Sequence, residues 1–364
     1  MKKCFVYLVM FLAVSMAFAF AEADAATREK RPRKFIPFPV VFYSPETGMG
    51  FGAGALYYVN PHPDAVVQQP DTINGIGFYT LKNQMLLAAS INKYFMKSGN
   101  LLTMRAVGMK FPDMFWGIGP DTPDSAEEAY TPREIAFIGA YQWRLSPSAY
   151  LGPAYAFSDI DMKVVEEGGL LDEGDITGSD GTLVSALGAR FTLDRRDSSI
   201  YARTGNFFDV TFLAANRVLG SQEDFIQLDL DYRHFFSAFT THVIALQYIM
   251  QVRTGTVPFQ FLPRLGGQYM MRGFYEGRYR DLDYYALQGE YRFPLVWRLG
   301  GVAFTSVGKV GPDIPTLFSF TDLRIAAGAG LRFLMDPENH VNFRFDVAYN
   351  GKEAAFYFNV LEAF

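Results

Sequence analysis

The sequence predicts an all-β fold, a single antiparallel transmembrane β-barrel of about 16 strands. Strand-length segments alternate between apolar and polar residues up to the end of the chain. Aromatic residues make up 16% of the 364 residues, and no apolar run long enough for a membrane-spanning helix follows residue 20. Alternating strands with many aromatic residues are typical of barrels that have lipid outside and a polar interior.

The first 25 residues are interpreted as a secretory signal peptide. Lys2 and Lys3 precede an apolar run, and small residues at 19–25 provide two candidate cleavage sites. A membrane anchor is the alternative, but the run is short and is followed by small residues. Cys4 is the one cysteine and lies in this segment, so the exported chain would have no disulfide or thiolate metal site. Residues 26–34 are interpreted as a short basic tether, and residues 35–364 as the barrel.

The predicted strands are separated by turn residues. The alternation is clearest in residues 223–236 and 340–349, where one face is apolar and the other carries Asp, Arg, Gln and Asn. A soluble sandwich would also alternate, but so many aromatic-flanked strands behind an export signal favour a membrane barrel. The predicted strands are residues 35–43, 49–59, 72–81, 84–95, 101–110, 132–144, 149–161, 181–193, 206–216, 223–236, 240–253, 283–293, 298–308, 321–333, 340–349 and 353–361.

The lengths of the connections support an even number of strands. If both ends of the barrel domain lie in the periplasm, four long connections all fall on the outer side. The opposite side then receives mostly tight turns, as membrane barrels do. The long connections are residues 111–131, 162–180, 254–282 and 309–320.

The first hairpin and the last strand carry unusual residues that mark a predicted seam between the first and last strands. Gly50, Gly52 and Gly54 fall on one face of the second strand, which predicts sharp curvature or a segment packed closely against it. Phe364 is in phase with the apolar residues of the last strand, although Glu362 interrupts that face.

Residues 262–295 combine a loop rich in glycine and arginine with a strand. One face of this strand is apolar, whereas the other carries Gln288, Glu290 and Arg292. Charges of both signs on an inward face predict that the loop folds back and docks there.

Three segments together resemble the BamA/TamA family of outer-membrane assembly and translocation barrels, the bacterial surface antigen family. Residues 43–48 are similar to the first hairpin of many members. Residues 194–205 are similar to a periplasmic turn of the family, with Arg203 where proline is usual. Residues 271–281 resemble the family's Arg-Gly-Phe loop between strands 11 and 12. The matching residues are Asp194, Arg196, Asp197 and Gly205 in the turn, and Arg272, Gly273, Phe274, Gly277 and Arg278 in the loop.

This resemblance implies that Arg272 docks inside the barrel against acidic residues of the following strands. Glu290 matches the first acidic partner. The second is usually the aspartate of a Phe-x-Asp-x-Gly strand, but here Phe304 is followed by Ser306. The contact would then be weaker, or another acid such as Asp229 or Asp346 would have to replace the missing one, because a buried guanidinium needs carboxylate partners. The alternative is that Arg272 lies on an external loop.

The resemblance implies a function in the outer membrane of a Gram-negative cell. The expected activity is insertion or translocation of unfolded outer-membrane or exported proteins through a weak first–last strand seam that opens laterally to lipid. The family's periplasmic POTRA domains have no counterpart before residue 35, so the chain resembles a branch without them, and a separate periplasmic partner would replace them. The alternatives are a passive pore or structural barrel and, less favoured, lipid trafficking or an outer-membrane hydrolase.

The sequence shows no pattern that indicates enzyme chemistry. The four histidines lack metal-ligand spacing, and no nucleophile elbow, phosphate-binding loop or dinucleotide fingerprint is present. We therefore predict no catalytic residues, no cofactor and no metal. We also predict no nucleic-acid partner, because the formal net charge is -5 and nothing in the sequence is strongly basic.

Overall fold

The computed structural model describes residues 33–364 except residues 68, 200 and 337–340. The predicted signal peptide and residues 26–32 of the predicted tether lie outside the described residues. Within the described part, no helix is long and apolar enough to cross a membrane.

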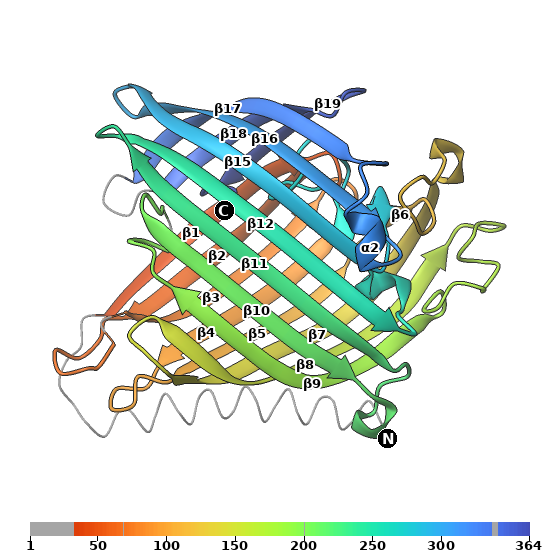
Figure 1. Cartoon of the computed structure of the whole chain (residues 1–364), viewed down its shortest axis with the longest axis horizontal. Helices are drawn as coiled ribbons and strands as arrows, with labels where there is room; N and C mark the ends of the chain where they lie inside the picture. Colours follow the sequence, from red (N-terminus) through yellow and green to blue (C-terminus); the bar gives the residue numbers. More distant parts are fainter. Residues whose placement is uncertain (1–32, 68, 200, 337–340) are drawn as a thin grey trace.

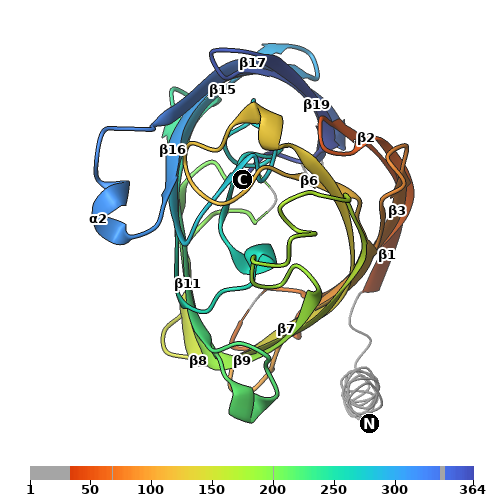
Figure 2. The same ribbon diagram turned by 90° about the vertical axis from the view of Figure 1, so that its right-hand side faces the viewer.

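The described residues form a closed antiparallel barrel of sixteen wall strands, as the sequence predicts (Figures 1 and 2). Each wall strand pairs with its neighbours in sequence, and β1 meets β19 to close the cylinder. The wall strands are β1 (Arg33–Ser44), β2 (Gly48–Val59), β3 (Asp71–Thr80), β4 (Met85–Tyr94), β5 (Leu101–Lys110), β7 (Glu128–Arg144), β8 (Ala149–Val165), β9 (Gly181–Asp194), β10 (Gly205–Ala215), β11 (Phe225–Ala238), β12 (His242–Gly255), β15 (Asp283–Val296), β16 (Leu299–Gly311), β17 (Arg324–Asp336), β18 (Val341–Tyr349) and β19 (Ala354–Val360).

Each of the sixteen predicted segments overlaps one wall strand. The largest differences are at the outer ends of β7 and β8. β7 starts earlier than predicted and β8 ends later, and the two strands pair with each other as far as Tyr130 and Val165. These residues lack the alternation on which the prediction rests.

The short elements lie in the connections. They are β6 (Asp113–Phe115), which pairs with β7, the pair β13 (Arg264–Leu265) and β14 (Tyr279–Arg280), the helix α2 (Ile314–Leu317), and three 3-10 turns at Asp124–Ala126, Arg217–Leu219 and Phe259–Phe261. The elements of the predicted long connections gather at one end of the barrel, on the right of Figure 1.

Residues that alternate between apolar and polar in the sequence alternate in the structure between the lipid-facing surface and the interior of the barrel, here called the bore. On β18, Phe345 and Val347 are half exposed on the outside, whereas Arg344 and Asp346 are buried inside. The wall therefore encloses charged side chains, and their partners must come from other strands or from a segment inside the barrel.

Candidate functional site in the bore and at the seam

The connection between β12 and β15, residues 256–282, folds into the barrel (Figure 2). The pairing of β13 with β14 gives this loop an antiparallel stem, in which Leu265 lies opposite Tyr279. Met271 and Phe274 at its tip are buried together with wall residues such as Ala286. Apolar packing on the wall thus contributes to holding the loop inside.

The tip lies against the wall at main-chain level. Gly273 has a φ of 111°, and a Cβ atom there would lie 3.4 Å from the Cβ of Ala326. Its N–H donates to the Tyr357 hydroxyl at 2.9 Å, and its carbonyl accepts from Asn350 Nδ2 at 2.8 Å. The glycine of the Arg-Gly-Phe motif thus permits the turn and the close approach.

Arg272 extends from this tip into a fully buried site. Its Nη1 donates to Asp346 Oδ2 at 2.6 Å, and its Nη2 donates to Glu290. Its Cζ lies 3.6 Å from the centre of the Phe304 ring, a cation–π contact. The structure therefore contains the predicted Arg272–Glu290 pair, with Phe304 covering one face of the guanidinium.

Ser306 is not part of this contact. It is buried opposite Gln288, and its hydroxyl has no hydrogen-bond partner among the described residues. Asp346 supplies the second acid, whereas Asp229 pairs with Arg253 at 2.7 Å.

Asp346 can reach the site because β17 carries glycine beside it. A Cβ atom at Gly330 would lie 2.0 Å from Asp346 Oδ1, and a Cβ at Gly328 would lie 2.4 Å from the Phe304 ring. These two glycines were the signal in the sequence that the prediction missed.

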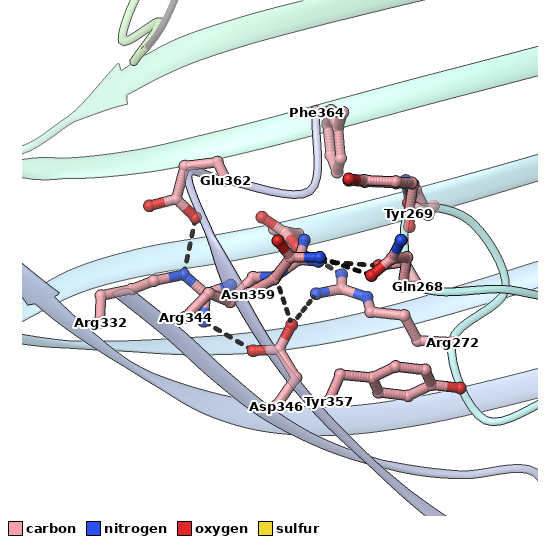
Figure 3. A network of polar contacts seen from close by, with 12 residues as sticks. Gln268, Tyr269, Arg272, Arg332, Arg344, Asp346, Tyr357, Asn359, Glu362 and Phe364 are labelled. Atoms are coloured by element: carbon pink, nitrogen blue, oxygen red, sulfur yellow. Dashed lines mark hydrogen bonds and ion pairs between the residues drawn. The ribbon is translucent and has the colours of Figure 1, made fainter. Parts of the chain in front are cut away.

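Further charged groups extend this contact into a network (Figure 3). It contains four guanidiniums and three carboxylates, all buried. Arg332 joins two of the acids, since it donates to Asp346 Oδ1 at 2.6 Å and to Glu362 Oε2 at 2.7 Å. The other contacts are Arg292 Nε to Glu290 Oε2 at 2.9 Å and Arg344 Nε to Asp346 Oδ2 at 3.6 Å.

The last residues of the sequence take part in this network. β19 ends at Val360, Leu361 turns the chain with a φ of 70°, and Glu362 accepts from Arg332 and from Asn342 Nδ2 at 2.8 Å. Phe364 lies in the bore near Phe235, with 6.2 Å between ring centres (Figures 1 and 2).

The expectation that Phe364 continues the lipid-facing side of the last strand is therefore wrong. A strand that continued to Phe364 would have placed the Glu362 carboxylate on the same lipid-facing side. A carboxylate is stabilised by the guanidiniums of the bore, so the chain leaves the wall after Val360.

The seam between β1 and β19 is far shorter than the neighbouring strand pairings. A single residue pair, Tyr43 with Phe358, joins these strands among the described residues. On either side, β1 and β2 share twelve pairs, and β18 and β19 share seven. Most of β1 therefore has an edge without a partner strand in the described structure.

Two prolines occupy this free edge. Pro37 and Pro39 lie within the complete ladder between β1 and β2, although neither has an N–H. Their nitrogens must therefore point away from β2, toward the seam. Continuing the register of the seam would place them opposite Phe364 and Glu362, the residues that have turned into the bore. An unpaired N–H in lipid costs several kcal/mol, so prolines at these positions lower the cost of an open edge.

This orientation leads to a prediction about neighbouring valines. In Val40→Pro, the lost N–H is one that faces β2, and the free energy of unfolding should fall by several kcal/mol, because a carbonyl group of β2 loses its partner within the membrane. In Val41→Pro, the lost N–H faces the seam, and the decrease should be much smaller. Urea unfolding of both variants in lipid vesicles measures the difference, and equal losses would contradict the proposed orientation of β1.

The glycines of β2 accommodate the rings of β1 and the backbone of β3. A Cβ atom at Gly50 would lie 2.3 Å from Phe42 Cζ, and one at Gly54 would lie 2.4 Å from the Phe38 ring. A Cβ atom at Gly52 would lie 2.1 Å from the carbonyl oxygen of Gly77. The segment that packs on the glycine face is thus largely β1 itself.

Alanine substitutions should therefore differ along this hairpin. We expect Gly52→Ala to lower the free energy of unfolding by about 1–3 kcal/mol, because the main chain of β3 must move. Gly50→Ala should cost less, because a side-chain ring can shift. Gly75→Ala in β3 is the control, since no atom lies within 4 Å of its Cβ position. Urea midpoints in vesicles give the order, and a neutral Gly52→Ala would contradict the close approach.

Gly277 and Arg278 lie away from Arg272, at the outer mouth. Gly277 has a φ of 85°, and Arg278 donates to the side chain of Asp124 at 2.6 Å. The neighbouring Glu276 N–H donates to Glu46 Oε1 at 3.0 Å. Burial raises the pKa of the Glu46 carboxyl above its ordinary value, against the effect of its hydrogen bonds. These contacts connect the loop to the first hairpin and to the connection before β7.

The predicted turn motif shapes the connection between β9 and β10. Arg196 pairs with Asp194 at 2.7 Å, and Asp197 Oδ1 accepts from the N–H groups of Arg203 and Thr204. Gly205 has a φ of 98°, and a Cβ atom there would lie 2.1 Å from the Arg195 carbonyl oxygen. These residues hold a turn on the side opposite to the Arg272 loop's entrance.

A family model described as the Omp85 superfamily domain matches residues 140–364, which include the inward loop, the charged network and β19. The chain belongs to the Omp85 superfamily. This Omp85 chain is an outer-membrane β-barrel of the BamA/TamA type.

Solved structures support the same fold. BamA from Haemophilus ducreyi lacking POTRA domains 1-3 aligns with a TM-score of 0.63 at 14% identity, covering 92% of this chain and 71% of that chain. CdiB from Acinetobacter baumannii (TM-score 0.54, 11% identity) and CdiB from Escherichia coli (0.59, 10%) each align over 92% of this chain. The chain spans 60% and 63% of those two proteins. No curated protein matches the sequence.

Proposed function

We propose that this Omp85 barrel inserts proteins into the outer membrane, or translocates them across it, by opening between β1 and β19. The observation that carries the proposal is the single residue pair that joins these strands. Separating them breaks few hydrogen bonds, at about 0.5–1.5 kcal/mol each, whereas any other opening of the wall breaks a long ladder. The seam is thus the place where the cylinder opens at the least cost.

An open seam provides an edge to which an extended segment can add. β1 offers carbonyl groups along its seam side, but N–H groups only outside Pro37 and Pro39. A client strand would therefore mainly donate hydrogen bonds at the centre of this edge. Unfolded outer-membrane or exported proteins are the proposed clients, and a separate periplasmic protein is the proposed partner that delivers them.

The contents of the bore support this function over that of a passive pore. The loop at residues 256–282 and the last residues of the sequence both lie inside the wall. A cavity of about 280 Å³ remains beside β11 and β12, lined by polar side chains such as Gln227, Gln251 and Arg253. We propose no catalytic residue, cofactor or metal for this chain.

Depletion of the protein, followed by a quantitative survey of the outer membrane, tests the proposal. We expect a defined set of outer-membrane or exported proteins to decrease. The complementary experiment places the purified barrel in vesicles and measures the folding rate of an added unfolded barrel protein. Faster folding supports insertion. An unchanged protein survey together with ion conductance through the barrel would instead support a pore, and selective loss of a lipid would support lipid trafficking.

A further inference from the structure

The connection between β16 and β17, residues 312–323, lies on the outer surface of the wall. Figures 1 and 2 both show its helix α2 outside the cylinder, beside the outer end of β16. Leu317 of this helix is fully buried, and a Cβ atom at Gly311 would lie 3.3 Å from the Thr316 side chain. The connection is therefore folded back onto the wall.

The folded connection covers a lysine on the side of β16 that faces outward. Phe304 and Ser306 face the bore, so Lys309, at an odd-numbered position, faces the other way. Lys309 is nonetheless fully buried. Its Nζ donates to Ser319 Oγ at 2.5 Å and lies 3.5 Å from Thr321 Oγ1. No described carboxylate lies within ion-pair distance of it. An ammonium facing lipid is costly, and these hydroxyl groups shield it.

The opposite side of the same connection is apolar and exposed. Phe318 is 70% exposed, Phe320 is 93% exposed, and Ile314 is also exposed. They continue the lipid-facing surface of the wall, because the neighbouring Ile325 is exposed and pairs with Val307 in the same phase as Lys309. Aromatic side chains at such a boundary favour the interface between membrane and water.

We propose that residues 314–320 form a membrane anchor, with Phe318 and Phe320 inserted into the outer leaflet beside β16. The partner is lipid, because the apolar side chains adjoin the lipid-facing wall directly. The two aspartates that flank the segment, Asp313 and Asp322, are exposed and would remain among the lipid head groups or in water. Lys309 holds the segment against the wall through Ser319 and Thr321. This proposal does not depend on the seam.

Spin labels on single cysteines test the anchor. Phe318→Cys and Phe320→Cys, each in a Cys4→Ser chain, are labelled and folded into vesicles of phosphatidylcholine and phosphatidylglycerol. Asp175→Cys, exposed in the connection between β8 and β9, is the control. Collision of each label with oxygen, which enters lipid, is compared with collision with a water-soluble nickel complex. Heat-dependent migration on a gel verifies that each chain has folded.

Labels at 318 and 320 should lose collisions with nickel and gain collisions with oxygen relative to the label at 175. The same accessibility to nickel at all three positions would overturn the proposal and leave these side chains as a surface in water. Because neither phenylalanine packs in the barrel, the substitutions should not impair folding. Two labelled positions allow the test to stand even if one variant does not fold.

Discussion

Arg272→Ala is expected to release the loop at residues 256–282 from the wall and to lower the free energy of unfolding by about 3–5 kcal/mol. The substitution leaves Glu290 without its loop partner and removes one of the cations around Asp346, while both carboxylates stay buried. It also removes the cation–π contact with Phe304. Urea unfolding in vesicles measures the stability, and hydrogen exchange of the loop measures its release.

Arg278→Ala is the matched control within the same motif. Its acidic partner Asp124 is largely exposed, and exposed ion pairs contribute about 1 kcal/mol or less. Arg272→Lys should fall between these two variants, because an ammonium cannot reproduce the two-sided contact of a guanidinium. Similar losses for Arg272→Ala and Arg278→Ala would show that the buried network does not hold the loop.

A covalent link across the seam is expected to abolish the proposed activity while leaving the fold intact. Tyr43 and Phe358 are opposite each other, and both side chains face outward. Opposed positions in an antiparallel pair have a separation suited to a disulfide. We therefore expect Tyr43→Cys with Phe358→Cys to form a link that stops client insertion under oxidising conditions. A reductant should break the link and restore client insertion.

The control keeps the same substitution in β19. Phe345→Cys with Phe358→Cys links β18 to β19, where the strands are already paired, and leaves the seam free. This variant should retain activity in both redox states. Client folding in vesicles, measured with and without reductant, distinguishes the two. Full activity of the seam-linked chain would rule out lateral opening between β1 and β19.

Much of the fold could be predicted because the relevant signal is local. Alternation along a strand depends only on neighbouring residues, and it indicated the strands, their number and the inward phase of Glu290. The Arg-Gly-Phe motif then indicated which loop carries the arginine that meets this acid. A proline within a strand is also a local signal, but its direction relative to the seam became clear only from the ladder to β2.

The remaining features depended on which distant strands meet, and alternation does not contain that information. Alternation places Asp346 in the bore. Only the assembled wall, in which Gly330 lies beside Asp346, brings this acid to Arg272. The same pattern predicts Phe364 on the lipid face, because the prediction continues the last strand to the end of the sequence. The tertiary structure decided otherwise: Arg292 of β15, Arg332 of β17 and Asn342 of β18 surround Glu362. The stabilisation of the carboxylate among these groups outweighs the continuation of β19 to the end of the sequence.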